Sequence, residues 1–446
     1  MLFQLPSFLI FLMVVLCLTR VLQGPWIKIV LIGSSFIFYS FWNIHFIWIL
    51  AFYIVIALVY VSTFSKINKL KFLFVLIVLI PLLFFKYTNF ILQSVGVQHL
   101  LHIGLPLGIS FITFTLISFI VDYSRSPHKR INLLDVSLYI SFFPHLIAGP
   151  ILRSHELIPQ LSHIHVGWKN IRYNLPLFAI GMIKKVLIAD QIASYIEPIF
   201  LQPQQYHFLE LMTAAVGFTI QIYCDFSAYS DMAIAVAGMF GIRFPENFRS
   251  PYLAFSMTET WKRWHMTLSF WLRDYVFIPL VRYCRNSFPH LPILLTMLVS
   301  GLWHGASWNF VLWGALQGII MMAESYLGYG KFISRHPQFK WMAIVINFII
   351  WTFLLILFRC QSIAIAGDFY QGLLSVDPHY LGTVNMGVMG LSALVLLLHR
   401  FDQVNVIRNC AAKLPQPLLI PVLCIIILGC SLVAAQRPES FYYFDF

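Results

Sequence analysis

Long apolar runs separated by short polar segments make up the first 125 residues of the chain. The runs cover residues 2–18, 26–42, 44–64, 72–92 and 103–123. Each is close to the ~20 residues that an α-helix needs to cross about 30 Å of hydrocarbon. The pattern therefore predicts five transmembrane helices. The first is expected to be a retained span and not a signal peptide, because no Lys or Arg precedes it and no small-residue cleavage site follows it.

Basic side chains gather in every second loop of this region. The loops at residues 66–71 and 125–130 are basic, whereas the loop at residues 94–102 has no Lys or Arg. Near the C-terminus, basic segments again flank a loop that carries Asp368 and Asp377. Cytoplasmic loops of membrane proteins are enriched in Lys and Arg. The basic loops are therefore predicted to face the cytoplasm, and both chain termini to lie on the opposite side.

The composition agrees with a polytopic membrane protein. Of the 446 residues, 60% are hydrophobic and only 10% are charged, whereas ordinary soluble domains are about 45–50% apolar and about 25% charged. This balance excludes a soluble enzyme, a disordered protein and a secreted disulfide scaffold. The net charge of +12 follows from the basic loops, so no nucleic-acid partner is expected. The seven cysteines are scattered without a C-x-x-C pair, and neither a zinc site nor a disulfide framework is predicted.

The middle of the chain, about residues 140–330, has a different pattern. Its apolar runs are broken by Gly, Pro and charged residues, among them Lys184 and Lys185. Polar groups inside a bilayer are costly unless they are satisfied, so these residues should face a bundle interior or a watery cavity. We expect one membrane domain over residues 1–446, with N-terminal spans at 1–130, a catalytic core at 140–330 and C-terminal spans at 340–446.

Asp225 and Asp231 raise the question of a metal site. A spacing of six residues does not place two side chains on one face of a helix, so a site built on both carboxylates is disfavoured and no metal is predicted. Ion pairs with Lys184, Lys185 or Arg243 are the favoured interpretation. The chain also lacks the H-E-x-x-H, G-x-S-x-G, P-loop and G-x-G-x-x-G motifs.

Two histidines follow a tryptophan in apolar surroundings, at Trp264-His265 and Trp303-His304. A neutral imidazole in a low-dielectric cavity is suited to act as a general base. The alternative is a core histidine whose nitrogens are satisfied by the backbone. The segment around His304, residues 292–326, lies between basic flanks and has 35 residues. It fits two short arms that enter and leave the membrane, with His304 near the tip, and it also fits one long tilted helix.

Four stretches of the middle region carry a resemblance to a known family. They are residues 142–153 (FFPHLIAGPILR), residues 181–190 (GMIKKVLIAD), a third running from DFSAYSD at 225–231 through FPENF at 244–248 to WH at 264–265 and WLRDY at 271–275, and residues 301–308 (GLWHGASW). With them the chain strongly resembles the membrane-bound O-acyltransferases, in particular the bacterial alginate O-acetyltransferase branch. One departure is His145, where the family usually has Gln.

The resemblance implies a fold and a set of site residues. The fold is an all-α polytopic bundle of about 11–13 transmembrane or re-entrant helices, horseshoe-like, with a funnel on each side. His304 takes the position of the catalytic histidine, and His265 matches a second, supporting polar position. Trp303, Asn309 and Arg273 are assigned to substrate binding.

The resemblance also implies the substrates and partners. No cofactor is expected to be bound; the co-substrate is a cytosolic acyl thioester such as acetyl-CoA. Basic residues such as Lys262 and Arg263 are candidates to attract its phosphates, although ordinary membrane topology accounts for them equally well. The acceptor is a polysaccharide outside the cytoplasm, reached through a separate periplasmic acetyltransferase. The protein is then expected in membrane lipid, in the bacterial inner membrane, with both termini periplasmic.

Three other functions stay open at this point. The related D-alanyl transfer proteins of cell-wall teichoic acid synthesis share the architecture, but their histidine segment is less similar. A proton-coupled transporter also accommodates broken helices and buried carboxylates, although no internal repeat is evident. A third possibility, a scaffold for a secretion complex, would tolerate loss of both histidines.

Overall fold

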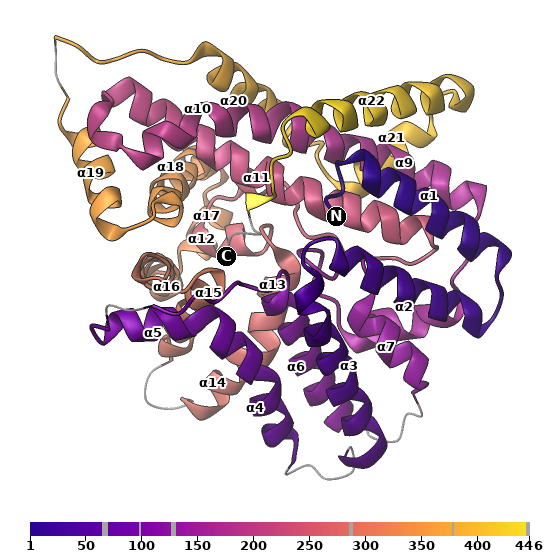
Figure 1. Ribbon diagram of the computed structural model, residues 1–446. Helices are drawn as coiled ribbons and strands as arrows, with labels where there is room; N and C mark the ends of the chain where they lie inside the picture. The colour runs from indigo at the N-terminus through magenta and orange to yellow at the C-terminus, as the bar shows by residue number, and fades with distance from the viewer. Residues whose placement is uncertain (65–69, 98–99, 126–130, 285–288, 377–378, 443–446) are drawn as a thin grey trace. The chain divides into compact units, whose positions relative to one another are not determined.

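A computed structural model describes residues 1–64, 70–97, 100–125, 131–284, 289–376 and 379–442. Every regular element among these residues is helical (Figure 1), which confirms the all-α prediction. Helices long and apolar enough to cross a membrane lie at Ile44–Ser62, Lys71–Ser94, Pro337–Arg359 and Gln416–Gln436. Four shorter apolar helices accompany them, at Pro6–Val21, Pro25–Ser40, Leu291–His304 and Met386–Leu398. The chain is therefore a multi-pass membrane protein.

The chain folds into two compact units. The first consists of Met1–Met182, Tyr229–Glu246 and Arg408–Asp445. Its helices are α1 (Pro6–Val21), α2 (Pro25–Ser40), α3 (Ile47–Val59), α4 (Lys71–Leu82), α5 (Thr88–Ser94), α6 (Ile109–Arg125), α7 (Leu133–Ser141), α8 (Ser154–Leu157), α9 (Trp168–Met182) and α22 (Gln416–Gln436). The division of the chain into N-terminal, catalytic and C-terminal parts stays a prediction.

Local sequence explains where several of these helices begin. α1 and α2 each start with a proline in the first turn, where the missing N–H has no helical partner to lose. The fifth predicted span starts later than its apolar run, at Ile109. Gly108 just before it has φ +70°, and a Cβ there would lie 2.7 Å from the carbonyl oxygen of Leu146. This close approach of two backbones ends the preceding loop and sets the start of α6.

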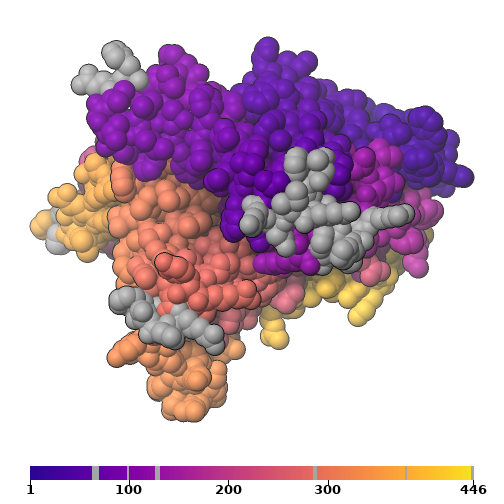
Figure 2. Space-filling model, turned by 90° about the horizontal axis from the view of Figure 1, so that it is seen from below, coloured from indigo at the N-terminus to yellow at the C-terminus, as the bar shows by residue number. Residues whose placement is uncertain are grey.

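The surface of the first unit is strongly apolar in places. The part of the chain that contains α4 lies at the surface in the space-filling view (Figure 2, purple). α4 exposes Phe72, Leu76 and Ile80, each at least 60% accessible. Contiguous apolar surface of this kind is unusual on a soluble protein and is expected where a helix faces lipid.

The second unit consists of Ile183–Ala228 and Asn247–Ile407. α11 (Phe208–Met239) belongs to both units, and α21 (Val404–Ala412) crosses their boundary. The other helices of the second unit are α10 (Asp190–Leu201), α12 (Met257–Trp261), α13 (Met266–Leu272), α14 (Ile278–Tyr283), α15 (Leu291–His304), α16 (Trp308–Tyr326), α17 (Tyr329–Arg335), α18 (Lys340–Arg359), α19 (Ile363–Leu374) and α20 (Met386–Leu398), with π-helical turns η6 (Ile183–Ala189) and η9 (Arg273–Phe277). Both tryptophan–histidine pairs lie in this unit.

Candidate functional site

The segment around His304 forms a helical hairpin. α15 ends at His304 and α16 begins at Trp308, with the side chain of Ser307 capping α16 by accepting a hydrogen bond from the N–H of Asn309. The two helices run antiparallel and pack closely. A Cβ on Gly301 would lie 2.2 Å from the carbonyl oxygen of Phe310, and one on Gly314 would lie 2.3 Å from that of Met297. Of the two predicted arrangements, the structure has the two arms, with His304 at the turn between them.

His304 is enclosed by aromatic rings. Its side chain is 1% exposed. The imidazole meets the rings of Trp303, Trp313 and Phe358 at centroid distances of 4.8, 5.0 and 5.3 Å, all at steep interplanar angles. Such an apolar enclosure lowers the local dielectric and excludes water. The surroundings of His304 are therefore suited to general base chemistry.

His265 is held by polar contacts in an unusual backbone conformation. It has φ +44° and precedes α13, a left-handed conformation that costs a non-glycine residue of order 1–3 kcal/mol. Asn247 stabilises it: its Oδ1 accepts from the N–H of Thr267 at 3.2 Å and from the Thr267 hydroxyl at 2.9 Å. The same Oδ1 lies 3.2 Å from Nδ1 of His265. Since this oxygen is an acceptor, Nδ1 donates, and the neutral ring carries its lone pair on Nε2.

Trp303 brings the two histidines into one site. Its ring lies 5.6 Å from that of His265 and 4.8 Å from that of His304, centroid to centroid. More tryptophans surround the site and pack edge to face: Trp261 with Trp313 at 6.0 Å, Trp261 with Trp351 at 6.2 Å, and Trp264 with Trp351 at 5.4 Å. Three of the predicted site residues, His265, Trp303 and His304, therefore lie together in the structure and are surrounded by aromatic rings.

The other two predicted binding residues make contacts of their own. Asn309 is buried, and its amide donates to the carbonyl oxygen of Cys360 at 2.7 Å, which ties the start of α16 to the end of α18. Arg273 is about half exposed and forms an ion pair with Asp274, with Nε 2.7 Å from Oδ1. Nothing in these contacts tests a role in substrate binding, so both assignments stay predictions.

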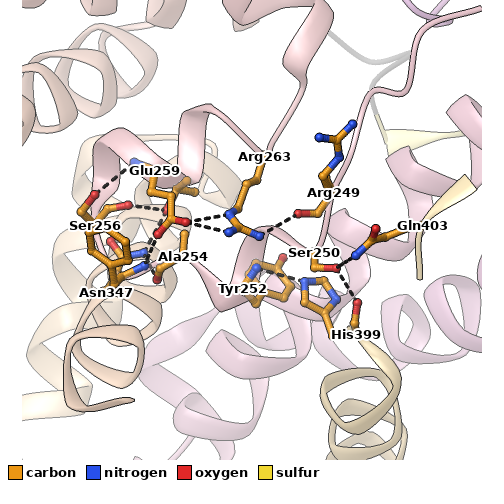
Figure 3. Close-up of polar contacts among 12 residues, drawn as sticks. Arg249, Ser250, Tyr252, Ala254, Ser256, Glu259, Arg263, Asn347, His399 and Gln403 are labelled. Carbon is orange, nitrogen blue, oxygen red and sulfur yellow. Dashed lines mark hydrogen bonds and ion pairs between the residues drawn. The ribbon is translucent and has the colours of Figure 1, made fainter. Parts of the chain in front are cut away.

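The loop that leads into His265 is braced by a polar network (Figure 3). The guanidinium of Arg263 forms an ion pair with Glu259, with Nη2 2.7 Å from Oε1. Backbone bonds add to it: the N–H of Arg249 donates to the carbonyl oxygen of Arg263 at 2.9 Å. Asn347 of α18 donates to the carbonyl oxygen of Ala254 at 2.9 Å. Arg263 is therefore engaged within the protein, whereas the predicted phosphate-attracting neighbour Lys262 is exposed.

A third buried histidine, His399, supports the same loop. Its Nε2 accepts a hydrogen bond from the backbone N–H of Tyr252 at 3.0 Å, and its carbonyl oxygen accepts from the Ser250 hydroxyl at 2.8 Å (Figure 3). An Nε2 that accepts belongs to a neutral ring. Burial lowers the pKa of His399 to about 4, although nearby Asp402 opposes the shift.

The lysines that interrupt the apolar pattern form buried ion pairs. Nζ of Lys185 lies 2.7 Å from Asp225 and 2.9 Å from Asp190, which confirms the ion-pair interpretation of Asp225. Nζ of Lys184 lies 3.0 Å from Asp402, which also accepts from the hydroxyl of Tyr223 at 2.7 Å. Burial alone would raise the pKa of Asp402, but Lys184 and Tyr223 hold it below its ordinary value.

Asn247, Asp402 and Tyr223 are functional or supporting residues that the sequence interpretation did not single out. Asn247 lies within the stretch FPENF that carries the family resemblance, but nothing in that stretch indicates a hydrogen bond to His265. Asp402 lies 218 residues from Lys184, and no local pattern predicts a pair at that separation. Within the described part of the chain, no three His, Cys, Asp or Glu side chains form a group able to hold a metal ion.

The chain is similar to known proteins over most of its length. The model of the membrane-bound O-acyltransferase family matches residues 35–367. A probable alginate O-acetylase of Pseudomonas aeruginosa is 36% identical over 391 residues, covering 83% of this chain and 74% of that protein. A peptidoglycan O-acetyltransferase of Helicobacter pylori is 32% identical, covering 78% and 74%. A teichoic acid D-alanyltransferase of Streptococcus thermophilus is 28% identical, covering 70% and 81%.

Proposed function

Because the chain belongs to the membrane-bound O-acyltransferase family, and so is an O-acyltransferase, we propose that it passes an acetyl group from a cytosolic thioester such as acetyl-CoA toward hydroxyls of a polysaccharide outside the cytoplasm. The observation that carries the proposal is the placement of His304. It is buried at the turn of a glycine-packed hairpin, within an aromatic enclosure that also contacts His265 through Trp303.

The reaction needs a base, an oriented thioester and the exclusion of water. In the proposed step, His304 takes the proton of the attacking hydroxyl as its oxygen bonds to the thioester carbonyl carbon. The carbon–sulfur bond then breaks, and the thiolate that leaves takes the proton back from the imidazolium. The products are an ester and a free thiol, and the histidine returns to its neutral form.

His265 and Trp303 are proposed to position the reactants. The hydrogen bond from Nδ1 of His265 to Asn247 makes Nε2 the acceptor nitrogen of the neutral ring, the form that can accept from a hydroxyl. Trp303 packs against both histidines, and an indole N–H is a donor of the kind that suits a carbonyl or an oxyanion. Asn309 and Arg273 complete the proposed binding set.

A separate transferase is proposed to complete delivery to the polymer. The largest segment expected outside the cytoplasm, about residues 362–385, has only 24 residues, too few for a domain that holds an extended polysaccharide. A periplasmic acetyltransferase would supply that domain. The proposed location is the bacterial inner membrane, with both termini periplasmic, as the distribution of Lys and Arg indicates.

The test is acyl transfer by the purified chain in phospholipid nanodiscs. We expect consumption of radiolabelled acetyl-CoA that depends on an added hydroxyl acceptor or on the partner transferase. A D-alanyl thioester serves as the competing donor; preference for it would favour the teichoic acid branch of the family. Solute flux into vesicles that contain no acyl donor would instead support a transporter and contradict the proposal.

A further inference from the structure

α19 has a polar face that the catalytic site does not use. Asp368, Gln371 and Gly372 stand at i, i+3 and i+4, the spacing that places residues on one side of a helix, and Ser375 follows directly after the last residue of α19. The rest of the helix is apolar, and the residues it buries are Ala366, Phe369 and Leu373. A polar stripe on an otherwise apolar helix of a membrane protein needs a polar surrounding.

That polar face lines a pocket of about 310 Å³. The other walls come from the turn η7 (Pro203–Gln205), from Tyr206 and His207 before α11, and from Tyr380. The rings of His207 and Tyr380 stand nearly perpendicular, 4.5 Å apart. Gln204 donates from Nε2 to Oδ2 of Asp368 at 2.5 Å. The pocket thus combines aromatic faces with an amide–carboxylate pair.

Backbone contacts hold Tyr380 over the pocket. The N–H of Leu209 donates to the carbonyl oxygen of Leu381 at 2.9 Å. Gly382 has φ +82°, and a Cβ there would lie 2.8 Å from the Cβ of His207 and 3.0 Å from a carboxylate oxygen of Glu210. The tight approach at Gly382 lets the segment after Tyr380 lie against the start of α11. The pocket wall is therefore built into the fold.

The charge around the pocket differs from that of the whole protein. The chain has a net charge of +12, yet residues 201–210 and 361–385 contain no Lys or Arg. Among the residues that the structure describes, they carry instead the carboxylates of Glu210 and Asp368. Segments without basic residues are expected outside the cytoplasm. The local charge disfavours phosphates, coenzyme A and acidic sugars as ligands, and it suits a neutral ligand rich in hydroxyl groups.

We propose that this pocket is an extracytoplasmic binding site for a neutral pyranose unit of the acceptor glycan. Tyr380 and Tyr206 offer aromatic faces for the C–H side of a sugar ring, while Asp368 accepts and Gln204 and Gln371 exchange hydrogen bonds with its hydroxyls. The volume lies at the small end of ligand pockets and holds roughly one or two sugar units. The claim that the bound sugar is part of the acceptor glycan rests on the proposed acyl transfer. The claim that the pocket binds a sugar does not depend on that proposal.

The test is direct binding of sugars to the full chain. The protein is placed in phosphatidylcholine nanodiscs, because alkyl maltoside detergents carry a sugar headgroup that competes. Saturation-transfer NMR and equilibrium dialysis then compare a neutral glucose trisaccharide with an oligouronate of equal length. We expect the neutral sugar to bind and the oligouronate to bind at least about tenfold more weakly, because its carboxylates are repelled by the carboxylate of Asp368.

Two variants and one control locate the site. Tyr380→Ala removes an aromatic ring on which the sugar is proposed to stack and should weaken binding of the trisaccharide about tenfold. Asp368→Asn keeps the shape of the side chain but removes its charge. It should weaken binding of the neutral sugar severalfold and strengthen binding of the oligouronate. Tyr283→Ala removes a tyrosine that is 90% exposed on α14 and should leave both affinities unchanged. Equal binding of the two sugars by the wild type, or unchanged binding by Tyr380→Ala, overturns the proposal. These measurements contain no acyl donor, so they fail or succeed independently of the catalytic proposal.

Discussion

The surroundings of His265 and of His304 differ although both residues follow a tryptophan. His304 ends a helix, and its ring packs against Trp303, Trp313 and Phe358. His265 precedes a helix in a left-handed conformation, with its ring bonded to the side chain of Asn247. Aromatic rings contact both imidazoles, since that of His265 lies 4.7 Å from Phe226 and 5.6 Å from Trp303, and His265 is distinguished by the polar clamp that its hydrogen bond to Asn247 provides.

The difference indicates that the same Trp-His motif serves two roles in this protein, removal of a proton and positioning of a substrate. Apolar enclosure keeps an imidazole neutral and water away, which suits the residue that removes a proton. A fixed hydrogen bond sets a tautomer and an orientation, which suits a residue that positions a substrate. We therefore expect substitutions at His304 to affect the chemical step, and substitutions around His265 to affect both stability and rate.

The largest expected effect comes from His304→Ala. Cells that carry this variant should lose acetyl groups from the acceptor glycan by about 10²–10⁴-fold, the usual contribution of a general base. Mass spectrometry of the surface glycans measures it, with immunoblots to show that the protein level is unchanged. A glycan acetylated as in the wild type contradicts the role given to His304.

Asn247→Ala removes the acceptor for three hydrogen bonds, from His265 and from the N–H and hydroxyl of Thr267. We expect a loss of about 3 kcal/mol in the free energy of unfolding and a lower rate of acyl transfer, because His265 is no longer oriented. Thermal unfolding in nanodiscs and a transfer assay measure the two effects. The control is Asn405→Ala, at an exposed position of α21, which should be neutral. If Asn247→Ala and Asn405→Ala have the same free energy of unfolding, the hydrogen bonds of Asn247 do not stabilise the turn at His265.

Gly314→Ala tests the hairpin that places His304. The added Cβ would lie 2.3 Å from the backbone oxygen of Met297, so α15 and α16 must separate. We expect a destabilisation of about 2 kcal/mol. Gly390→Ala is the matched control, because a Cβ there meets no atom within 4 Å and alanine favours a helix. If both variants melt at the same temperature, close packing of the hairpin is not what positions His304.

A third histidine gives a smaller, pH-dependent effect. The pKa of His399 falls to about 4 through burial, below the value of about 6.5 for an unfolded chain. Its neutral form therefore stabilises the fold above pH 6.5, and this stabilisation is lost as the pH falls toward 4. At pH 5 the loss is about 2 kcal/mol. Melting temperatures at pH 7.5 and pH 5 measure it. His399→Gln should show a weaker pH dependence; an unchanged dependence would assign the effect to other groups.

Much of the fold was predictable from sequence, because lipid-exposed helices need long apolar runs. The predicted run at residues 72–92 corresponds to the helical segment Lys71–Ser94, and the hairpin around His304 was one of two arrangements that its length allowed. The pairing of Lys185 with Asp225 followed from the cost of buried charge.

The remainder of the site depends on contacts that sequence spacing does not show. The hydrogen bond between Asn247 and His265 depends on the left-handed conformation of His265 itself. Lys184 pairs with Asp402, which is 218 residues away in the sequence. The sequence also does not show that Asp368 and Gln371 line a pocket, because Tyr206, His207 and Tyr380 reach that pocket only in the folded chain.

The central claim is that His304 acts in the chemical step and His265 in positioning. It is tested most directly by single-turnover acyl transfer at saturating thioester, measured side by side for the wild type, His304→Ala and His265→Ala. Each sample is first shown to be folded by its melting temperature. The account predicts a folded His304→Ala protein whose rate constant falls by about 10²–10⁴-fold, and a smaller fall or a lower melting temperature for His265→Ala. A near-wild-type rate constant for folded His304→Ala, or a larger loss for folded His265→Ala, contradicts it.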